Sequence, residues 1–556
     1  MKRTNWYKDA VIYQIYPKSF CDGNGDGLGD IPGIISKLDY LKELGVNCVW
    51  LSPVYDSPQK DNGYDIANYR DIYKPFGTLD DFKLMLDEMH KRGIRLIMDL
   101  VVNHTSDQHM WFQEAIKDKN SPYRDYYIIR KGKKNGKKPP NNWSGFFGEG
   151  AWSRLPGSED EWYLRLFTKE QPDLNWENPK VRQEVIDLIN YWLDMGVDGF
   201  RCDVITLISK KQDFKSRFPT LILCGKDAYV NGPRLHEYLH LLNKECFSKY
   251  DSATVGETVM ASLKDTINLV SPEREELDMV FNFSHTDSDN YLGVKYLYRP
   301  FKLSRFRNRL TKYQVGLEGK GWNSLFIENH DQRRSPGRFG TDDQEYRVIS
   351  SKMLATCYFL MKGTPFIYQG QEIAMTNINS NDINDYDDIE LHNMYNKCQE
   401  SSFFKLLIGK HLFDTSRDNP RSPMLWDDSE YAGFSNVKPW LLVNKNKSFI
   451  NVKAAKKDPN STYYYYQKLI QLRKELPVLK EGKYILHHKH NKNVYIYERN
   501  DGINSVLVIC NFKKGSVKNP SRKELEGYKL ILSNYEENDL HTLKPYEARV
   551  YIKEIK

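Results

Sequence analysis

Short apolar runs alternate with helical patterns through most of this chain, and this alternation limits the folds open to it. Helical spacing of apolar residues marks residues 31–45, which end at Gly45, and residues 80–93 and 178–196. The apolar runs read as eight strands, at residues 11–16, 48–51, 95–102, 199–201, 253–256, 279–283, 324–327 and 365–368. Strands separated by helices pair in parallel with right-handed crossovers. We therefore predict an α/β fold, a (β/α)8 TIM barrel.

Two stretches depart from this alternation. Residues 105–174 are rich in Trp, Gly, Pro and Lys, and they are too long for an unstructured loop in a compact domain. Beyond residue 478 the helical pattern stops, and five strand-like runs with turn signals predict a small antiparallel β-sandwich. We predict a catalytic barrel over residues 1–104 and 175–478, a subdomain inserted after the third strand over 105–174, and a C-terminal β-domain over 479–556.

Composition argues against several classes of partner. The net charge of +7 is small for 556 residues, and the basic run at 130–138 lacks interleaved aromatics, so no nucleic-acid partner is expected. The N-terminus has no leader pattern, and no apolar run reaches about 18 residues, so no membrane association is expected. The eight cysteines form no CxxC pair, which disfavours a zinc or redox site. We expect a cytoplasmic monomer without an organic cofactor.

Three carboxylates each follow an apolar run that reads as a strand: Asp203, Glu257 and Asp331. A carboxylate at the end of a buried strand is costly unless it faces a polar cleft. In a barrel the carboxyl ends of the strands share one face, where active sites form. The sequence therefore predicts that these three side chains line one site.

Two such carboxylates suit the hydrolysis of a glycosidic bond, which takes a general acid and a second carboxylate on the other side of the sugar. Arg201 points to the same side of its strand as Asp203 and favours an ionised nucleophile there. Glu257 has no cation beside it in the sequence, which suits the general acid. His104 and His330 are placed to donate hydrogen bonds to sugar hydroxyls. Structural alternatives remain open for each residue: a cap or turn anchor, a buried salt bridge, or a core histidine.

A glycine-rich loop near the N-terminus resembles a calcium-binding loop. Its oxygen-bearing side chains match loop positions 1, 3, 5 and 9, and a backbone carbonyl is available at position 7. These residues are Asp22, Asn24, Asp26 and Asp30, with the carbonyl of Leu28. Gly33 stands at position 12 in place of Glu, so other ligands must complete the shell. We expect structural Ca²⁺, with Mg²⁺ or a metal-free turn as alternatives.

Several motifs together resemble the α-amylase family of glycoside hydrolases, and within it the oligo-1,6-glucosidases and related bacterial α-glucosidases. They run nearly end to end and include AVIYQIYPKSF, DGNGDGLGD, NGYDIANY, DLVVNHTSDQH, QPDLNW, GFRCDVI, TVGET, FIENHDQ, GTPFIYQGQEI and RDNPRSPMLWD. The resemblance implies a calcium-associated (β/α)8 barrel, a domain inserted after the third strand and a C-terminal β-domain.

By motif, the resemblance implies that Asp203 is the nucleophile and Glu257 the acid/base. Asp331 is then the third carboxylate, which binds ring hydroxyls. The implied contacts with a terminal glucose are Tyr64, Asp65, His104, Gln171, Arg201, His330 and Arg421. Phe147 and Phe167 line the pocket or form the core of the inserted subdomain, and both interpretations stay open.

The residue after the nucleophile bears on bond preference in this family. Val204 stands there, and the resemblance links Val to α-1,6 bonds and Ala or Thr to α-1,4 bonds. The resemblance thus implies a retaining, exo-acting α-glucosidase that releases glucose from isomaltose-like oligosaccharides.

Two adjacent arginines bear on the leaving group. They are Arg333, at a position where relatives often have Pro, and Arg334, and their charge favours an anionic leaving group. Trehalose-6-phosphate hydrolysis and sucrose or α-1,4-glucoside hydrolysis are the alternatives. A non-enzymatic scaffold of the kind found in amino-acid transporter heavy chains is a further one.

Overall fold

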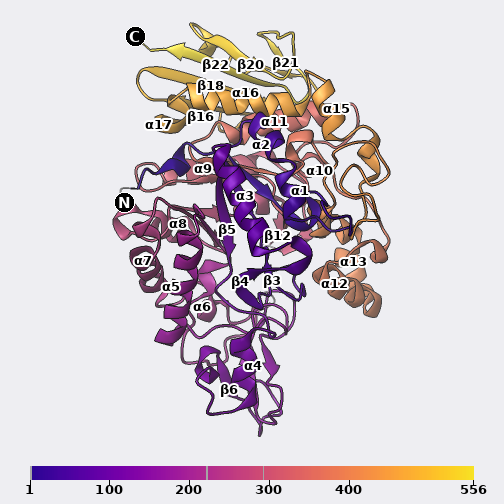
Figure 1. Cartoon of the computed structure of the whole chain (residues 1–556). Coiled ribbons are helices and arrows are strands. Elements are labelled where there is room, and N and C mark those ends of the chain that lie inside the picture. The colour runs from indigo at the N-terminus through magenta and orange to yellow at the C-terminus, as the bar shows by residue number, and fades with distance from the viewer. Residues whose placement is uncertain (1–2, 221–222, 292–293, 556) are drawn as a thin grey trace. The chain divides into compact units, whose positions relative to one another are not determined.

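The computed structural model describes residues 3–220, 223–291 and 294–555 (Figure 1). Eight of its strands form one sheet. The order in this sheet is β11-β10-β9-β5-β2-β1-β15-β14, which is the chain order when read as a circle. That order is the topology of a (β/α)8 barrel. All eight predicted strands are present, which confirms the predicted fold class. They are β1 (Ile12–Ile15), β2 (Cys48–Leu51), β5 (Arg95–Leu100), β9 (Gly199–Cys202), β10 (Ala253–Thr258), β11 (Met279–Asn282), β14 (Ser324–Leu325) and β15 (Thr364–Tyr368).

Helices connect these strands. None of the helices in the described residues has both the length and the apolar composition that spanning a bilayer takes. Their bounds are α1 (Ile31–Ile35), α2 (Leu38–Leu44), α3 (Leu79–Lys91), α4 (Met110–Lys117), α5 (Pro179–Asp194), α6 (Lys226–Tyr229), α7 (Leu235–Glu245), α8 (Leu263–Val270), α9 (Leu303–Gly316), α10 (Ser335–Phe339), α11 (Arg347–Phe359), α12 (Ile389–Glu400), α13 (Ser402–Ile408), α14 (Asp418–Arg421), α15 (Val452–Lys457), α16 (Thr462–Glu475) and α17 (Val478–Glu481).

The helix predicted over residues 31–45 is divided into α1 and α2. The hydroxyl of Ser36 donates to the carbonyl of Gly33 at 2.7 Å, and this local bond stands where the two helices separate. Such bonds from Ser to nearby backbone compete with a continuous helix. Gly45 ends α2 with a φ of 100°, a left-handed conformation that glycine adopts without a steric penalty, so the predicted stop is confirmed.

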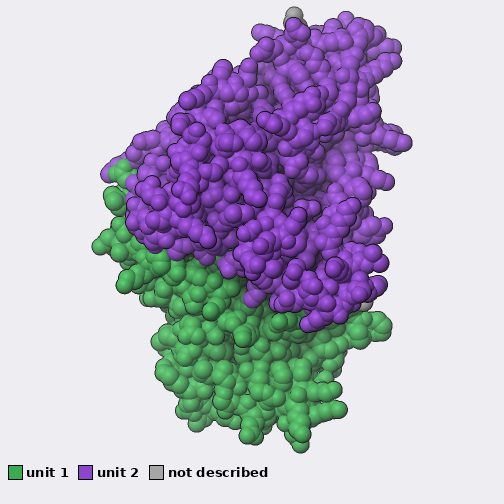
Figure 2. All heavy atoms as spheres, turned by 90° about the vertical axis from the view of Figure 1, so that its right-hand side faces the viewer, with its two compact units in different colours: residues 1–5, 50–90, 95–282 green, residues 6–49, 91–94, 283–556 purple. Residues whose placement is uncertain are grey.

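The chain divides into two compact units, which Figure 2 colours separately. The first unit comprises residues 1–5, 50–90 and 95–282, and the second comprises residues 6–49, 91–94 and 283–556. Strand β2 contains one of the boundaries, so it contributes residues to both units. The domain limits expected from the sequence remain a prediction.

In the first unit, the region predicted as an insertion contains a small antiparallel sheet. Its order is β6-β8-β7, with β6 (Ile129–Lys131), β7 (Trp152–Arg154) and β8 (Glu161–Leu164). Isolated bridges join His104 to Asp173 and Tyr127 to Leu174, so both ends of the region are tied together. A second ribbon, β3 (Tyr55–Asp56) with β4 (Asn68–Ile72), carries the loop between them.

In the second unit, the five C-terminal strands predicted from the sequence form one antiparallel sheet. Its order is β16-β17-β18-β22-β20, with β16 (Lys483–His487), β17 (Val494–Asn500), β18 (Asn504–Asn511), β20 (Lys529–Ser533) and β22 (Ala548–Glu554). Helix α11 lies against this sheet (Figure 1). The hydroxyl of Tyr497 on β17 donates to the carbonyl of Cys357 on α11 at 3.0 Å. The unit also contains an antiparallel pair of β12 (Asn290–Tyr291) and β13 (Val294–Tyr298).

A second layer packs on the C-terminal sheet. It is a two-residue ladder of β19 (Val517–Lys518) and β21 (Thr542–Leu543), which the sequence did not indicate. The buried apolar core between the layers consists of Val494, Ile496, Leu507, Ile509, Leu525, Leu543 and Tyr551. Alternate residues of β17 and β18 supply most of this core, as expected for a sheet covered on that face.

Candidate active site

In the first unit, the guanidinium of Arg201 joins three carboxyl groups. Its Nη1 atom lies 2.5 Å from Asp99 Oδ1 and 2.6 Å from Asp203 Oδ1. Its Nη2 atom lies 2.8 Å from Glu257 Oε2. The Arg201 side chain is 1% exposed, whereas those of Asp203 and Glu257 are 8% and 11% exposed. The predicted nucleophile and the predicted general acid therefore meet at one buried cation.

Strand register explains this meeting. Asp99 of β5 pairs with Arg201 of β9, and Arg201 pairs with Val255 of β10. Glu257 lies two residues beyond Val255 and so points to the same face of the sheet. Parallel pairing thus brings an acid from each neighbouring strand to the arginine of the central one.

Burial changes the proton affinity of these acids. It raises the pKa of Asp99 to about 6, although the charge of Arg201 acts in the opposite direction. Burial also raises the pKa of Asp203 well above its ordinary value, again against the effect of Arg201 and together with the nearby Glu257 carboxyl. The sequence led us to expect that Arg201 would keep Asp203 ionised. The charge of Arg201 does lower the pKa of Asp203 as expected, but desolvation raises that pKa by more.

The expectation that Glu257 has no neighbouring cation is wrong. Besides Arg201, the backbone N–H of Val204 contacts it, donating to Oε2 at 3.1 Å. Val204 has a φ of 34° and a ψ of 39°, a left-handed conformation that is strained for a β-branched residue. This turn directly after β9 aims the Val204 N–H at Glu257. The Val204 side chain is 7% exposed and packs in an apolar cluster that includes Trp143.

His104 and Gln171 lie together at the edge of the inserted region. The Nε2 atom of His104 lies 3.1 Å from both the Tyr64 carbonyl oxygen and Gln171 Nε2. Burial lowers the pKa of His104 to about 4, so the ring is neutral near pH 7. The Tyr64 hydroxyl donates to Asp99 Oδ2 at 3.3 Å, which links these residues to the Arg201 cluster.

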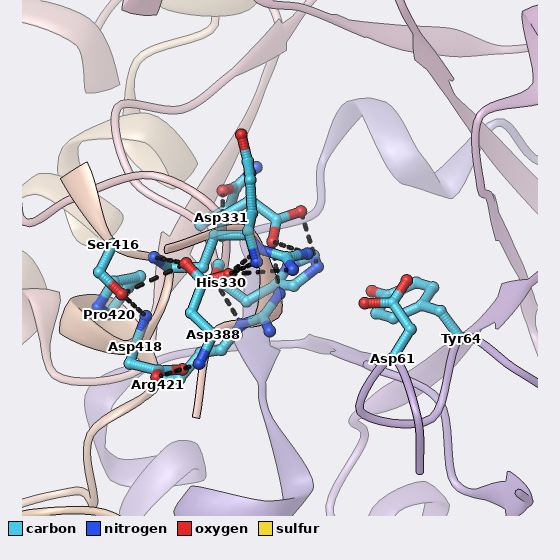
Figure 3. Close-up of polar contacts among 12 residues, drawn as sticks. Asp61, Tyr64, His330, Asp331, Asp388, Ser416, Asp418, Pro420 and Arg421 are labelled. Carbon is cyan, nitrogen blue, oxygen red and sulfur yellow. Dashed lines mark hydrogen bonds and ion pairs between the residues drawn. The ribbon is translucent and has the colours of Figure 1, made fainter. Parts of the chain in front are cut away.

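The carboxylate of Asp65 forms hydrogen bonds within its own loop. Its carboxylate accepts bonds from the backbone N–H groups of Lys60 and Asp61 at 2.8 and 2.9 Å and from the Ser57 hydroxyl at 3.1 Å. Burial raises its pKa to about 6. Asp61 accepts a bond from Gln171 Nε2 at 3.1 Å instead, and Figure 3 shows its side chain beside Tyr64. The role of Asp65 as a glucose contact remains a prediction, and Asp61 is a residue that the sequence analysis missed.

Phe147 and Phe167 form an aromatic group with His104. The ring centroids of His104 and Phe167 are 5.1 Å apart, and those of Phe147 and Phe167 are 5.8 Å apart. Phe146 stacks on Phe167 at 5.2 Å with nearly parallel rings. Phe147 and Phe167 are both partly exposed, so each offers apolar surface as well as packing.

In the second unit, Asp331 lies against Arg421 and His330 (Figure 3). Arg421 Nη2 is 2.5 Å from Asp331 Oδ1, and Arg421 Nε donates to the carbonyl of His330 at 3.0 Å. His330 Nε2 is 3.2 Å from Asp331 Oδ2, and its Nδ1 is 2.8 Å from Gln14 Nε2. The Asp331 side chain is 30% exposed while Arg421 is 1% exposed. These contacts leave Asp331 accessible, held by a buried cation.

The second unit thus contains Asp331, and the first contains Asp203 and Glu257. That all three line one site remains a prediction. Within each unit, a buried arginine holds a predicted catalytic carboxylate beside residues that the sequence analysis also selected.

Arg333 and Arg334 both have acidic partners inside the second unit. Arg334 is 1% exposed, and its Nη1 lies 3.2 Å from Glu328 Oε2. Arg333 Nη2 lies 2.5 Å from Asp289 Oδ2, and its guanidinium lies 4.9 Å from the centre of the Tyr298 ring. The charge of Arg334 is thus paired inside the protein. This weakens the expectation that Arg333 and Arg334 favour an anionic leaving group.

The glycine-rich loop predicted to bind calcium is folded by its own side chains. Asp22 accepts backbone N–H bonds from Gly25 at 2.6 Å and Gly27 at 2.9 Å. Asp30 caps α1 by accepting the N–H of Gly33 at 2.6 Å. Asn24 and Asp26 accept N–H bonds from residues two positions further on, and the N–H bound by Asp26 is that of Leu28. All candidate ligands are oxygens, as a hard cation prefers. The described residues contain no group of three or more His, Cys, Asp or Glu side chains placed to hold a metal.

A buried ion pair that the sequence analysis missed joins the inserted region to the barrel residues of the first unit. Lys210 Nζ lies 2.8 Å from Asp173 Oδ2 and donates to Asn103 Oδ1 at 2.7 Å. Both charged side chains are at most 1% exposed. Asp173 belongs to the QPDLN motif. An acid two residues after Gln171 was therefore the sequence signal that could have indicated this ion pair.

Comparisons with known proteins agree with this architecture. The family model described as alpha amylase, catalytic domain, matches residues 14–482. The chain is 52% identical to the oligo-1,6-glucosidase of Parageobacillus thermoglucosidasius, over 98% of each chain. It is 46% identical to the trehalose-6-phosphate hydrolase of Bacillus subtilis (strain 168), over 99% of this chain and 98% of that protein. The crystal structure of Bacillus licheniformis trehalose-6-phosphate hydrolase superposes with a TM-score of 0.92 at 45% identity, over 98% of this chain and 99% of that one.

The family match covers most of the chain, and the similarity to these relatives extends over nearly their full length. Together with the eight-stranded sheet and the carboxylates at its strand ends, this shows that the chain belongs to the α-amylase family of glycoside hydrolases.

Proposed function

We propose that this protein is a retaining, exo-acting α-glucosidase that hydrolyses terminal α-1,6-glucosidic bonds of isomaltose-like oligosaccharides and releases glucose. The observation that carries the proposal is the shared contact of Asp203 and Glu257 with Arg201, at 2.6 and 2.8 Å. Two carboxyl groups on one guanidinium favour the short separation of roughly 5 Å that a covalent mechanism uses, over the wider spacing that admits a water. Asp203 is the nucleophile and Glu257 the acid/base in this proposal.

Two observations support the α-1,6 preference. The relative that is 52% identical over nearly the whole chain is an oligo-1,6-glucosidase. Val204 follows the proposed nucleophile and is held in a strained turn beside Glu257, so its branched side chain has little freedom to move aside for a different leaving group. A methyl-scale change in such a pocket is worth about 1–3 kcal/mol of discrimination. A preference for α-1,6 bonds rather than exclusivity is therefore proposed.

Trehalose-6-phosphate hydrolysis is the second candidate, favoured by the similarity to two such hydrolases. It calls for a cation free to meet a phosphate group. Arg334 is buried and paired with Glu328, so it does not meet this need. Arg333 is 11% exposed but paired with Asp289. Because both arginines are already paired with acids, an uncharged isomaltose-like substrate is favoured over trehalose-6-phosphate.

A substrate panel with anomeric detection tests the proposal. Initial rates on isomaltose, maltose, sucrose and trehalose-6-phosphate should be highest on isomaltose, and the released glucose should keep the α configuration. A preference of more than tenfold for trehalose-6-phosphate would establish the second candidate instead. Glucose released with inverted configuration would contradict the roles of Asp203 and Glu257. Absence of turnover on every sugar would favour the non-enzymatic scaffold.

We also propose that the glycine-rich loop binds Ca²⁺ as a structural ion, through oxygens of Asp22, Asn24, Asp26 and Asp30 and the carbonyl of Leu28. The chemistry of these donors supports a hard cation, and Mg²⁺ is the alternative. Ser435 donates to Asp22 Oδ2 at 2.6 Å, so the loop is anchored to a distant segment of the second unit. Chelation should therefore lower the melting temperature while kcat at low temperature stays unchanged. An unchanged melting temperature after dialysis against chelator would contradict the assignment.

The cellular setting and assembly remain proposals. We propose a cytoplasmic monomer, in keeping with eight cysteines that are all free and buried. Light scattering coupled to size-exclusion chromatography should give the mass of one 65.4 kDa chain. A mass twice that value would contradict the monomer.

A further inference from the structure

A cleft of about 690 Å³ lies in the second unit, and its lining includes no residue proposed to touch sugar. Its walls are α11, the start of α16 and the turn after β20. Figure 1 labels the two helices and the strand. This volume is in the range of small-molecule sites in proteins. Val348 and Ile349 supply apolar lining, and the remaining lining is mostly polar.

Lys352 is the buried cation of this cleft. The residue is 6% exposed, and its Nζ atom lies 5.5 Å from the centre of the Tyr465 ring. Among the described residues its ammonium has no ion-pair partner. Burial lowers its pKa to about 8; the charge of Asp458 opposes this shift and that of Lys468 adds to it. A buried charge without a partner is costly, so its presence in a cleft calls for an anion.

The start of helix α16 faces the same cleft. Ser461 stands at the N-cap, where a serine hydroxyl ordinarily accepts a bond from the first turn of the helix, but here the side chain makes no capping bond. Its Oγ atom is buried and has no hydrogen-bond partner among the described residues, and Ser461 is 6% exposed. The helix is 14 residues long, so its N-terminus carries a partial positive charge. A serine hydroxyl without a partner among the described residues, at the positive end of a helix, is a candidate donor to an oxyanion.

We propose that this cleft binds the phosphate group of a small phosphorylated metabolite, through the Lys352 ammonium on α11 and the Ser461 hydroxyl at the start of α16. A tetrahedral phosphate offers several oxygens at once, so it can meet donors from two helices. The cleft is much larger than a phosphate ion, and this leaves room for the organic part of a phosphate ester.

The charges at the rim restrict the ligand further. Lys468 and Lys544 also line the cleft, and so do the acids Asp458, Glu536 and Glu537. Both glutamates and Asp458 are exposed. These carboxylates repel an extended polyanion such as a nucleic acid more strongly than they repel a single phosphate group. The proposal is independent of the glycosidase assignment, because no cleft residue belongs to the proposed sugar site.

Titration calorimetry on the full-length protein tests the proposal, with inorganic phosphate, glucose 6-phosphate and glucose as probes in phosphate-free buffer. Both phosphates should bind, glucose 6-phosphate more tightly, and glucose should not bind at this site. Lys352→Met keeps the length of the side chain without its charge and should weaken phosphate binding by about tenfold or more. Ser461→Ala should weaken it by a few-fold. Lys529→Met, at an exposed position of β20 outside the cleft, is the matched control and should bind as the wild type does.

Several results would overturn the proposal. Phosphate affinity equal to wild type in Lys352→Met, or the absence of phosphate binding to the wild-type protein, would each refute the site. Glucose and glucose 6-phosphate binding equally well would identify a sugar site instead. Glucose 6-phosphate binding that persists in Lys352→Met and is displaced by isomaltose would place the phosphate in the sugar site. If Lys352→Met fails to fold, sulfate supplies the test on wild type: its affinity should fall above about pH 8 as Lys352 loses its proton.

Discussion

Replacing Lys352 with methionine tests whether this lysine is held in the fold as an unpaired buried cation. Burial lowers its pKa from the ordinary 10.5 to about 8. Each pKa unit corresponds to about 1.4 kcal/mol, so the protonated side chain costs the folded state about 3 kcal/mol at neutral pH. Methionine fills similar space without a charge, and replacing buried ionic groups by apolar ones of similar volume is often stabilising. We expect Lys352→Met to be more stable than wild type at pH 7.

The stability difference between wild type and Lys352→Met depends on pH with a definite sign. Because the folded-state pKa lies below the unfolded one, the unfolded chain binds more protons between about pH 8 and pH 10. Wild-type stability therefore rises through that window relative to the variant, and the penalty is fully present below pH 8. From pH 7 to pH 10 the wild type should gain about 2.5 kcal/mol more than Lys352→Met.

Urea unfolding of both proteins at the two pH values measures this double difference, in which the contributions of all other groups cancel. Phosphate-free buffer keeps the cleft empty of its proposed ligand. Lys529→Met, at an exposed position, should give a double difference near zero. A value for Lys352→Met below about 0.5 kcal/mol would show that Lys352 is hydrated and ordinary, and would refute the argument from burial.

Three further predictions concern the proposed active site. Asp203→Asn and Glu257→Gln should each reduce kcat on isomaltose by roughly a thousandfold or more, and near-normal initial rates in either variant would contradict its role. Arg201→Met leaves three buried carboxyl groups without their cation and should destabilise the protein by about 3–5 kcal/mol in urea unfolding; a loss below about 1 kcal/mol would show that the groups relax apart. Val204→Ala should lower the ratio of isomaltose to maltose turnover by about tenfold or more, and an unchanged ratio would mean that the side chain only packs.

The fold was predictable because it depends on patterns within single segments. The barrel strands are short, buried and separated by helices, so each run was visible without knowing its partners. The five long strands of the C-terminal sheet were visible in the same way. The ladder of β19 and β21 was not, because a two-residue strand has no periodicity to detect.

The site was predictable only as far as residue type and position along a strand allow. Asp203 and Glu257 stand at strand ends, which the sequence shows directly. Asp99 lies inside β5, where an acid between apolar residues was the available signal. Its contact with Arg201 depends on the register between β5 and β9, which single-sequence reasoning does not supply. The pair of Lys210 and Asp173 depends likewise on how a distant loop folds back.

The arginine cluster shows why proton placement escaped the sequence. Along the chain, Arg201 is close to Asp203 alone, and Glu257 has no cation near it. In the fold one guanidinium serves Asp99, Asp203 and Glu257 together, so a single positive charge faces three acids in a buried place. Full ionisation would leave two uncompensated negative charges there, and burial accordingly raises the pKa of Asp99 and of Asp203. The two carboxyl groups of the proposed reaction thus share one cation with a third acid from another strand, and the neighbours of each residue along the chain do not show this arrangement.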